Sequence, residues 1–131
     1  IGKVNEYPIP ELRLPDSKSE SLLDIGCNWG RWSIAASRKG YDVVGLDPSL
    51  GAVMAAKRVA DQLGLSIRFV VGDARYLPFR GELFDYAFSY SVLQHFSKEN
   101  VTKTLHEVRR VLNADGKSAK FFRNKEFAAP V

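Results

Sequence analysis

Short apolar runs recur along the chain and are separated by segments with helical spacing. The runs are nearly continuous, which is typical of strands buried on both faces of a sheet. They lie at residues 21–25, 42–46, 66–71, 84–89 and 117–122. Pro78 and Gly81 predict a loop at residues 76–82, before the fourth of these strands.

Three helices are predicted between the strands. Residues 30–39 place Trp32, Ala35 and Ala36 on one face. A second helix runs from an N-cap at Ser49 to about Leu63, and a third follows Ser97. The apolar stripe of the third helix comprises Val101, Leu105, Val108 and Leu112.

Strands that alternate with helices predict an α/β fold, in which a parallel sheet is built through right-handed crossovers. Residues 1–19 hold three prolines and no sustained period, so we expect an irregular arm there. Residues 20–131 form the expected core.

Composition narrows the class of protein. A length of 131 residues suits one domain, and no stretch approaches the roughly 18 apolar residues of a membrane span. The single Cys27 excludes an internal disulfide and favours a reducing, cytoplasmic location.

The net charge of +4 includes a basic stretch at residues 109–125. We interpret that stretch as a solvated face, and not as a nucleic-acid site, because no aromatic–basic motif accompanies it.

Ligands of open α/β sheets bind beyond the carboxyl ends of the strands, and unusual residues cluster after four of the predicted strands. The first cluster is Asp24-Ile25-Gly26-Cys27-Asn28-Trp29-Gly30. A glycine-rich turn lets a ligand approach the backbone, and the helix start behind it offers free N–H groups. Asn28 stands where a dinucleotide fingerprint has glycine, and asparagine tolerates the positive φ that such a turn needs.

The second and third clusters each carry one carboxylate. Asp47, in Gly45-Leu46-Asp47-Pro48, is placed to accept both ribose hydroxyls, although it could instead cap the next helix. Asp73, in Gly72-Asp73-Ala74, can accept from an adenine amino group while a following backbone N–H donates to the ring; the alternative is an ordinary Asp turn.

The fourth cluster runs from Ser89 to His95. These residues lie across the switch point from the glycine turn and should face the end of the ligand away from the base, together with an incoming substrate. His95 is a candidate general base, with packing or capping at the start of the next helix as the alternative. The sequence holds no metal-ligand cluster.

Together these motifs resemble the class I S-adenosylmethionine-dependent methyltransferases, and most closely the small-molecule group with the ubiquinone and menaquinone C-methyltransferases. The resemblance covers about residues 21–122 and also includes Phe84-Asp85-Tyr86-Ala87-Phe88-Ser89, together with Glu107-Val108-Arg109-Arg110-Val111-Leu112 before Asp115-Gly116-Lys117. It implies a Rossmann-like, doubly wound sheet of strand order 3-2-1-4-5.

The resemblance also implies roles for individual residues. Asp24 would help to position the ammonium group of S-adenosylmethionine, Asp47 would bind the ribose, and Asp73 would bind the adenine. The full predicted cofactor-binding set is Asp24, Gly26, Cys27, Asn28, Gly30, Asp47, Pro48, Asp73, Ala74 and Ser89. Met54 is expected in the core, with a position near the adenine ring as the alternative.

Two departures from the family pattern matter. Asn28 replaces a common glycine, and too few residues follow Phe122 for the antiparallel hairpin that ends the family sheet. We therefore expect a truncated core with a bare sheet edge through which two copies could pair. The expected activity is methyl transfer to a small molecule. The alternatives are a non-catalytic cofactor-binding or interaction module and, disfavoured by glycine spacing, a dinucleotide oxidoreductase.

Overall fold

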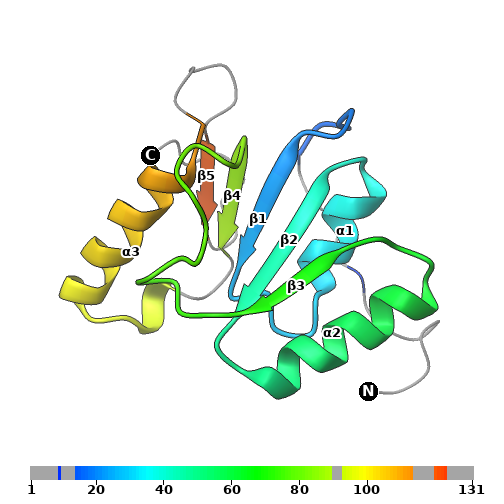
Figure 1. The fold of residues 1–131 in the computed structure, drawn as a ribbon, viewed down its shortest axis with the longest axis horizontal. Helices are drawn as coiled ribbons and strands as arrows, with labels where there is room; N and C mark the ends of the chain where they lie inside the picture. Colours follow the sequence, from blue (N-terminus) through cyan, green and yellow to red (C-terminus); the bar gives the residue numbers. More distant parts are fainter. Residues whose placement is uncertain (1–8, 10–13, 90–92, 114–119, 124–131) are drawn as a thin grey trace.

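Five strands form one parallel sheet of order β3-β2-β1-β4-β5 (Figure 1) in the computed structural model, which describes residue 9 and residues 14–89, 93–113 and 120–123. The strands are β1 (Ser21–Ile25), β2 (Asp42–Asp47), β3 (Arg68–Val71), β4 (Tyr86–Ser89) and β5 (Lys120–Arg123). The helices are α1 (Arg31–Arg38), α2 (Leu50–Gln62), the 3-10 turn η2 (Leu93–His95) and α3 (Lys98–Val111). The predicted α/β class and strand order are confirmed.

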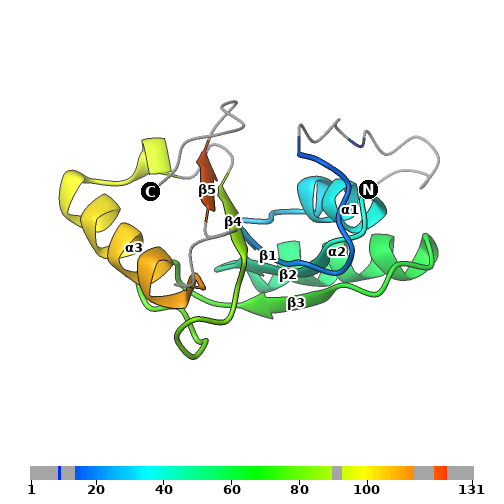
Figure 2. The ribbon, with the colours of Figure 1, turned by 90° about the horizontal axis from the view of Figure 1, so that it is seen from above.

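Helices cover both faces of the sheet (Figure 2). On one face α1 and α2 bury a cluster that includes Ile34, Ala36 and Val59. On the other face α3 packs Val108 and Val111 against the sheet. Burial on both faces explains why the strands are almost uninterrupted apolar runs.

Some element boundaries differ from the predicted ones. β4 begins at Tyr86, two residues later than predicted, and Phe84 makes only an isolated bridge to Leu112. β3 begins at Arg68, two residues later than predicted, and Arg68 pairs with Val44 of β2. The start predicted for the fifth strand, residues 117–119, lies outside the described residues.

The described part of the amino-terminal arm packs against the end of α1. Leu14 is buried in the core on the α1 side, and the Tyr41 hydroxyl donates to the Pro15 carbonyl at 2.8 Å. Ser17 N donates to the Lys39 carbonyl at 2.7 Å. No helix or strand includes residue 9 or residues 14–19. The division into arm and core remains a prediction.

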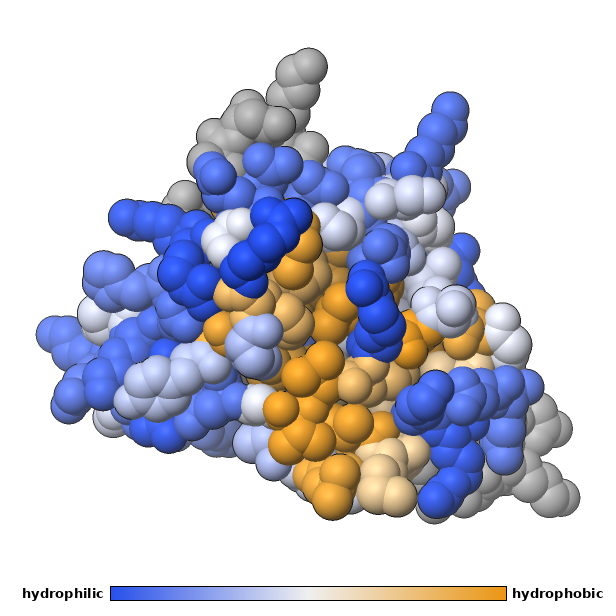
Figure 3. All heavy atoms as spheres, viewed as in Figure 1, coloured by the Kyte–Doolittle hydropathy of each residue, from blue (hydrophilic) through white to orange (hydrophobic). Residues whose placement is uncertain are grey.

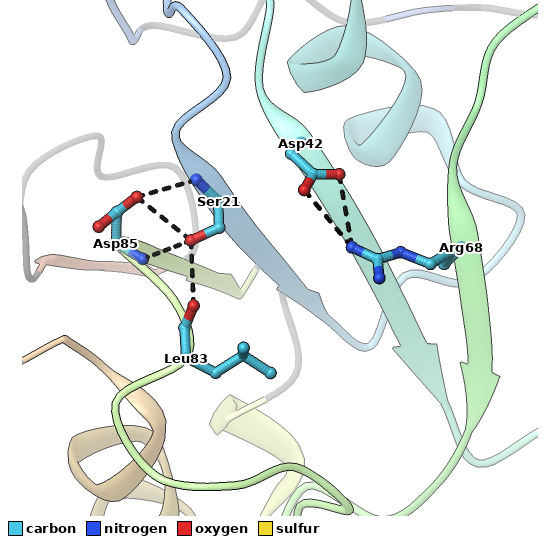
Figure 4. Close-up of polar contacts among 5 residues, drawn as sticks. All are labelled: Ser21, Asp42, Arg68, Leu83 and Asp85. Atoms are coloured by element: carbon cyan, nitrogen blue, oxygen red, sulfur yellow. Dashed lines mark hydrogen bonds and ion pairs between the residues drawn. The ribbon is translucent and has the colours of Figure 1, made fainter.

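Polar contacts join the strands at the amino-terminal edge of the sheet (Figure 4). Ser21 N donates to Asp85 Oδ2 at 3.0 Å, and Asp85 N donates to Ser21 Oγ at 2.9 Å. On the neighbouring pair of strands, Arg68 Nη2 lies 3.5 Å from both Asp42 oxygens. Side chains at the end where the strands begin thus hold neighbouring strands together. A cavity lies at the opposite end, where the strands finish.

An apolar surface covers the end of β3 and the start of α2 (Figure 3). Leu50, Met54 and Val71 are its exposed large side chains. Met54 is 55% exposed, so the expected core position of Met54 is wrong. In the described residues, no helix is both long and apolar enough to cross a bilayer.

Candidate functional site

The turn after β1 is built from residues with left-handed backbone. Gly26, Asn28 and Gly30 have φ of 71°, 51° and 88°, and asparagine tolerates this region better than most residues. The predicted backbone state of Asn28 is therefore confirmed. Gly26 N and Cys27 N both donate to the Leu46 carbonyl, at 2.8 and 2.9 Å, which ties the turn to β2.

Gly30 has a packing role at the end of this turn. A Cβ at this position would lie 3.0 Å from Ala56 Cβ and 3.3 Å from Phe69 Cζ. Only glycine combines this close approach with a φ of 88°. Gly30 holds the turn against α2 and β3 and is not among the residues that line the cavity.

Asp47 at the end of β2 is oriented by two backbone donors. Asn28 N donates to Oδ2 at 3.0 Å, and Ser49 N donates to Oδ1 at 2.9 Å. Ser49 Oγ accepts from Ala52 N at 3.2 Å and so caps α2 itself. A carboxylate offers about four lone-pair positions, so each Asp47 oxygen can still accept from a ligand hydroxyl.

Asp73, after β3, is paired with the neighbouring Arg75. Arg75 N and Nε donate to Oδ1 at 2.9 and 3.0 Å. Arg75 Nη2 and Nε donate to Oδ2 at 2.7 and 3.2 Å. The hydrogen bonds from Arg75 hold the pKa of Asp73 below its usual range. Ala74 is buried at the base of the same loop.

Asp24 lies behind the turn. It is 1% exposed, and Ser33 Oγ donates to its Oδ2 at 2.7 Å. Burial raises the pKa of Asp24 to about 7, against the opposing effect of the Ser33 hydrogen bond, and the negative charge of Asp47 adds to the rise. Asp24 does not line the cavity. The hydrogen-bond partner of its side chain in the structure is Ser33.

Cys27 and Ser89 are two further predicted site residues that are buried. Burial raises the pKa of the Cys27 thiol, so this side chain stays protonated at neutral pH. Ser89, paired in register with Ile25 at the end of β4, is 1% exposed. Its hydroxyl has no hydrogen-bond partner within the described part of the chain, and it does not line the cavity.

A cavity of about 700 Å³ lies at the carboxyl ends of the strands. It brings together the turn after β1, the ends of β1 and β2, the loop after β3 and the η2–α3 segment. Its lining comprises Ile25, Gly26, Cys27, Asn28, Trp29, Arg31, Trp32, Leu46, Asp47, Pro48, Asp73, Ala74, Arg75, His95, Phe96 and Asn100. Seven of the ten predicted cofactor residues and the candidate base His95 are therefore in one cavity.

Sequence reasoning missed several lining residues. Arg75 directly follows the Gly72-Asp73-Ala74 motif. Its position two residues after the predicted binding residue Asp73 could have marked it as a lining residue. Trp29 and Phe96 give the cavity an aromatic wall, and Trp29 is 46% exposed. Asn100 reaches the cavity from the first turn of α3. No local pattern marks it, since only the tertiary fold brings α3 to the loop after β3.

Comparison with known proteins agrees with this geometry. Residues 22–116 match the protein family described as "Methyltransferase domain". A ubiquinone biosynthesis O-methyltransferase from Azorhizobium caulinodans is 33% identical over 99 residues, which is 76% of this chain. The chain belongs to the class I S-adenosylmethionine-dependent methyltransferases.

Two solved structures share the fold. The YcgJ protein of Bacillus subtilis, named an uncharacterized methyltransferase, superposes with a TM-score of 0.72 at 32% identity over 81% of this chain. The PH0226 protein of Pyrococcus horikoshii gives a TM-score of 0.75 at 34% identity, also over 81% of this chain. This methyltransferase chain spans 38% of the Azorhizobium relative, and 44% and 49% of the two solved chains.

Proposed function

We propose that this domain binds S-adenosylmethionine in the cavity and transfers its methyl group to a small-molecule acceptor. The Asp47 carboxylate carries the proposal. Two backbone N–H groups orient it, it lies at the end of a parallel strand, and each of its oxygens can still accept a hydrogen bond. Carboxylates in this position recognise the two hydroxyls of a ribose.

The remaining lining residues fit the other parts of the cofactor. Ala74 and Pro48 offer an apolar surface to a planar base, beside the carboxylate of Asp73. Gly26, Cys27 and Asn28 form a turn whose backbone the amino-acid part of the cofactor can approach closely. We assign Asp24 an indirect role, in which its hydrogen bond with Ser33 holds the turn that faces the cofactor ammonium.

Ser89 and Gly30 support the site from behind its lining. The Ser89 hydroxyl lies at the end of β4, next in the sheet to the strand that leads into the glycine turn. We propose that this hydroxyl supports the methionine part of the site indirectly, from behind the lining, and that Gly30 fixes the turn itself.

Methyl transfer places modest chemical demands on the protein. When bound, the sulfonium supplies an electrophilic methyl group, which an acceptor attacks in line as the C–S bond breaks and its electron pair stays on sulfur. The protein aligns the two reactants and excludes water. Trp29 and Phe96 form an aromatic wall that suits an apolar or planar acceptor. His95, exposed in η2 at the cavity, is positioned to take a proton from an acceptor hydroxyl.

Calorimetry with S-adenosylhomocysteine tests cofactor binding. Asp47→Ala should weaken affinity by about 1–3 kcal/mol through loss of charge-assisted hydrogen bonds. Asp42→Ala is the matched control, because this exposed carboxylate lies at the other end of the same strand and should leave affinity unchanged. Equal affinities of the wild type and Asp47→Ala would remove Asp47 from the site.

The same proteins separate binding from catalysis when His95→Ala is added. With a catechol as the probe acceptor, His95→Ala should slow methyl transfer by about 10²-fold or more while leaving S-adenosylhomocysteine affinity unchanged. Undiminished transfer would exclude His95 as the base. Cofactor binding with no transfer to any of a panel of hydroxyl, amine and thiol acceptors would instead favour a non-catalytic binding module.

A further inference from the structure

Arg75 occupies the acceptor positions that the proposed adenine contact requires. Three N–H groups of Arg75 contact Asp73 at 2.7 to 3.2 Å: the backbone N–H on Oδ1, Nη2 on Oδ2, and Nε shared between both oxygens. A carboxylate offers about four lone-pair positions, so Arg75 leaves Asp73 at most one position for a further donor. Asp47, by contrast, has one described donor on each oxygen.

An adenine amino group is a weaker competitor for these positions than a guanidinium. The amino group is a neutral donor, whereas the Arg75 contact is a charge-assisted, paired hydrogen bond. The two side chains are 36% and 39% exposed, so solvent weakens the pair without abolishing it. An adenine amino group that approaches Asp73 therefore competes with the guanidinium, most directly with the Nε–H that is shared between the two oxygens.

The guanidinium has two further neighbours in the same conformation. Arg75 Nη1 lies 3.5 Å from Asn100 Oδ1, at the long limit of a hydrogen bond. The Arg75 guanidinium carbon is 5.6 Å from the centre of the Tyr76 ring, a distance typical of a cation–π contact. A small rotation of the side chain toward Asn100 and Tyr76 would free an oxygen of Asp73.

We propose that Arg75 is a positioning residue that sets the affinity and base selectivity of the cofactor site by competing with adenine for Asp73. The inference rests on the proposed function. Before binding, the guanidinium satisfies Asp73. On binding, it moves toward Asn100 and the adenine amino group takes its place. Cofactor binding therefore breaks part of the Asp73–Arg75 ion pair. The affinity for the cofactor is lower than it would be in a site without Arg75.

Calorimetry on Arg75 variants tests this exchange. Arg75→Ala and Arg75→Met should each bind S-adenosylhomocysteine about two- to fivefold more tightly than the wild type, the range expected for releasing an exposed ion pair. Arg75→Met keeps an apolar stem on the loop, so that a packing defect in the alanine variant does not decide the result. Arg68→Ala is the control, since it removes an exposed ion pair with Asp42 at the far edge of the sheet.

The inosyl analogue of S-adenosylhomocysteine supplies a readout that a merely structural role of Arg75 would not move. Its base carries a carbonyl oxygen in place of the amino group, so the exocyclic donor to Asp73 is absent, and we expect no gain in affinity when Arg75 is removed. The variants should therefore bind the adenosyl ligand more tightly and the inosyl ligand no more tightly.

Three results would overturn the inference: unchanged affinity, weaker affinity, or equal tightening for both ligands. The proposed function fails separately, if neither the wild type nor any variant binds S-adenosylhomocysteine. Binding by the Arg75 variants alone would support both proposals.

Discussion

Three aspartates lie near the carboxyl ends of neighbouring strands of the sheet, and each has a different environment. Asp24 is buried beside Ser33, Asp47 is held by two backbone donors, and Asp73 is paired with Arg75. Burial favours the neutral carboxyl group, whereas an adjacent guanidinium favours the carboxylate. The same residue type therefore supplies a buried structural group, a proposed ligand acceptor and an ion-pair partner in neighbouring positions.

The raised pKa of Asp24 predicts that stability depends on pH. Its folded-state pKa of about 7 lies above the ordinary value of 3.8, so the folded protein binds this proton more tightly. This contribution to stability is fully present below pH 3.8 and is lost as the pH rises to about 7. Across that window Asp24 should lower the free energy of unfolding by a few kcal/mol, at about 1.4 kcal/mol per pKa unit.

Urea unfolding of Asp24→Asn at pH 4, 5.5 and 7 measures this contribution. The variant should lose less stability between pH 4 and 7 than the wild type does. Asp42→Asn, at an exposed carboxylate, should follow the wild-type profile. Identical profiles for Asp24→Asn and the wild type would show that Asp24 is not desolvated in the folded protein.

The sequence was enough to predict which residues lie near the site, but not the hydrogen-bond partners and burial of their side chains. The aspartates near the ends of three strands and the unusual Asn28 all stand out in the chain as local patterns. That Asp24 faces Ser33, and that Arg75 takes the oxygens of Asp73, depends on side-chain directions that strand periodicity does not specify. Met54 shows the converse, because an apolar residue on a helix was expected in the core and is exposed.

At the scale of elements, β2 has to let α1 and β3 approach closely. A Cβ at Gly45 would lie 2.7 Å from Phe69 Cδ1 and 2.9 Å from Ser33 Oγ. No side chain larger than hydrogen fits between them. This strand also ends in Asp47, so its close packing helps to fix the position of the proposed ribose acceptor.

Gly45→Ala should therefore destabilise the fold by about 1–3 kcal/mol through overpacking. The measurement is urea unfolding followed by far-ultraviolet circular dichroism. Gly51→Ala on α2 is the matched control, since the nearest atom to its Cβ would be 3.8 Å away and alanine favours helix. The control should be neutral or stabilising. A Gly45→Ala protein as stable as the wild type would contradict the described packing.

Element order was readable from the sequence, whereas element ends depend on pairing. Helix starts at Ser49 and Ser97 were correct, because an N-cap is a local signal: each hydroxyl accepts from a backbone N–H three residues later. The start of β4 was not, since residue 84 bridges Leu112 and does not join the strand ladder. The turn η2 follows residues 90–92, outside the described residues, and carries no comparable signal.

At the scale of the whole molecule, the two ends of the strands differ: stabilising contacts lie at the amino-terminal end and the candidate site lies at the carboxyl end. Polar side chains at the amino-terminal edge join neighbouring strands (Figure 4), and those at the carboxyl edge surround a cavity. Convergence of the loops was predictable once a parallel sheet was recognised, because carboxyl ends of parallel strands share one edge. Pairing of two copies through a bare sheet edge remains a prediction.

A crystal structure of this chain with S-adenosylhomocysteine tests the central claim most directly. We expect the ligand in the cavity of about 700 Å³, with both ribose hydroxyls within hydrogen-bond distance of Asp47 and the adenine between Pro48 and Ala74. A ligand bound elsewhere on the protein, or no bound ligand at saturating concentration, would contradict the account.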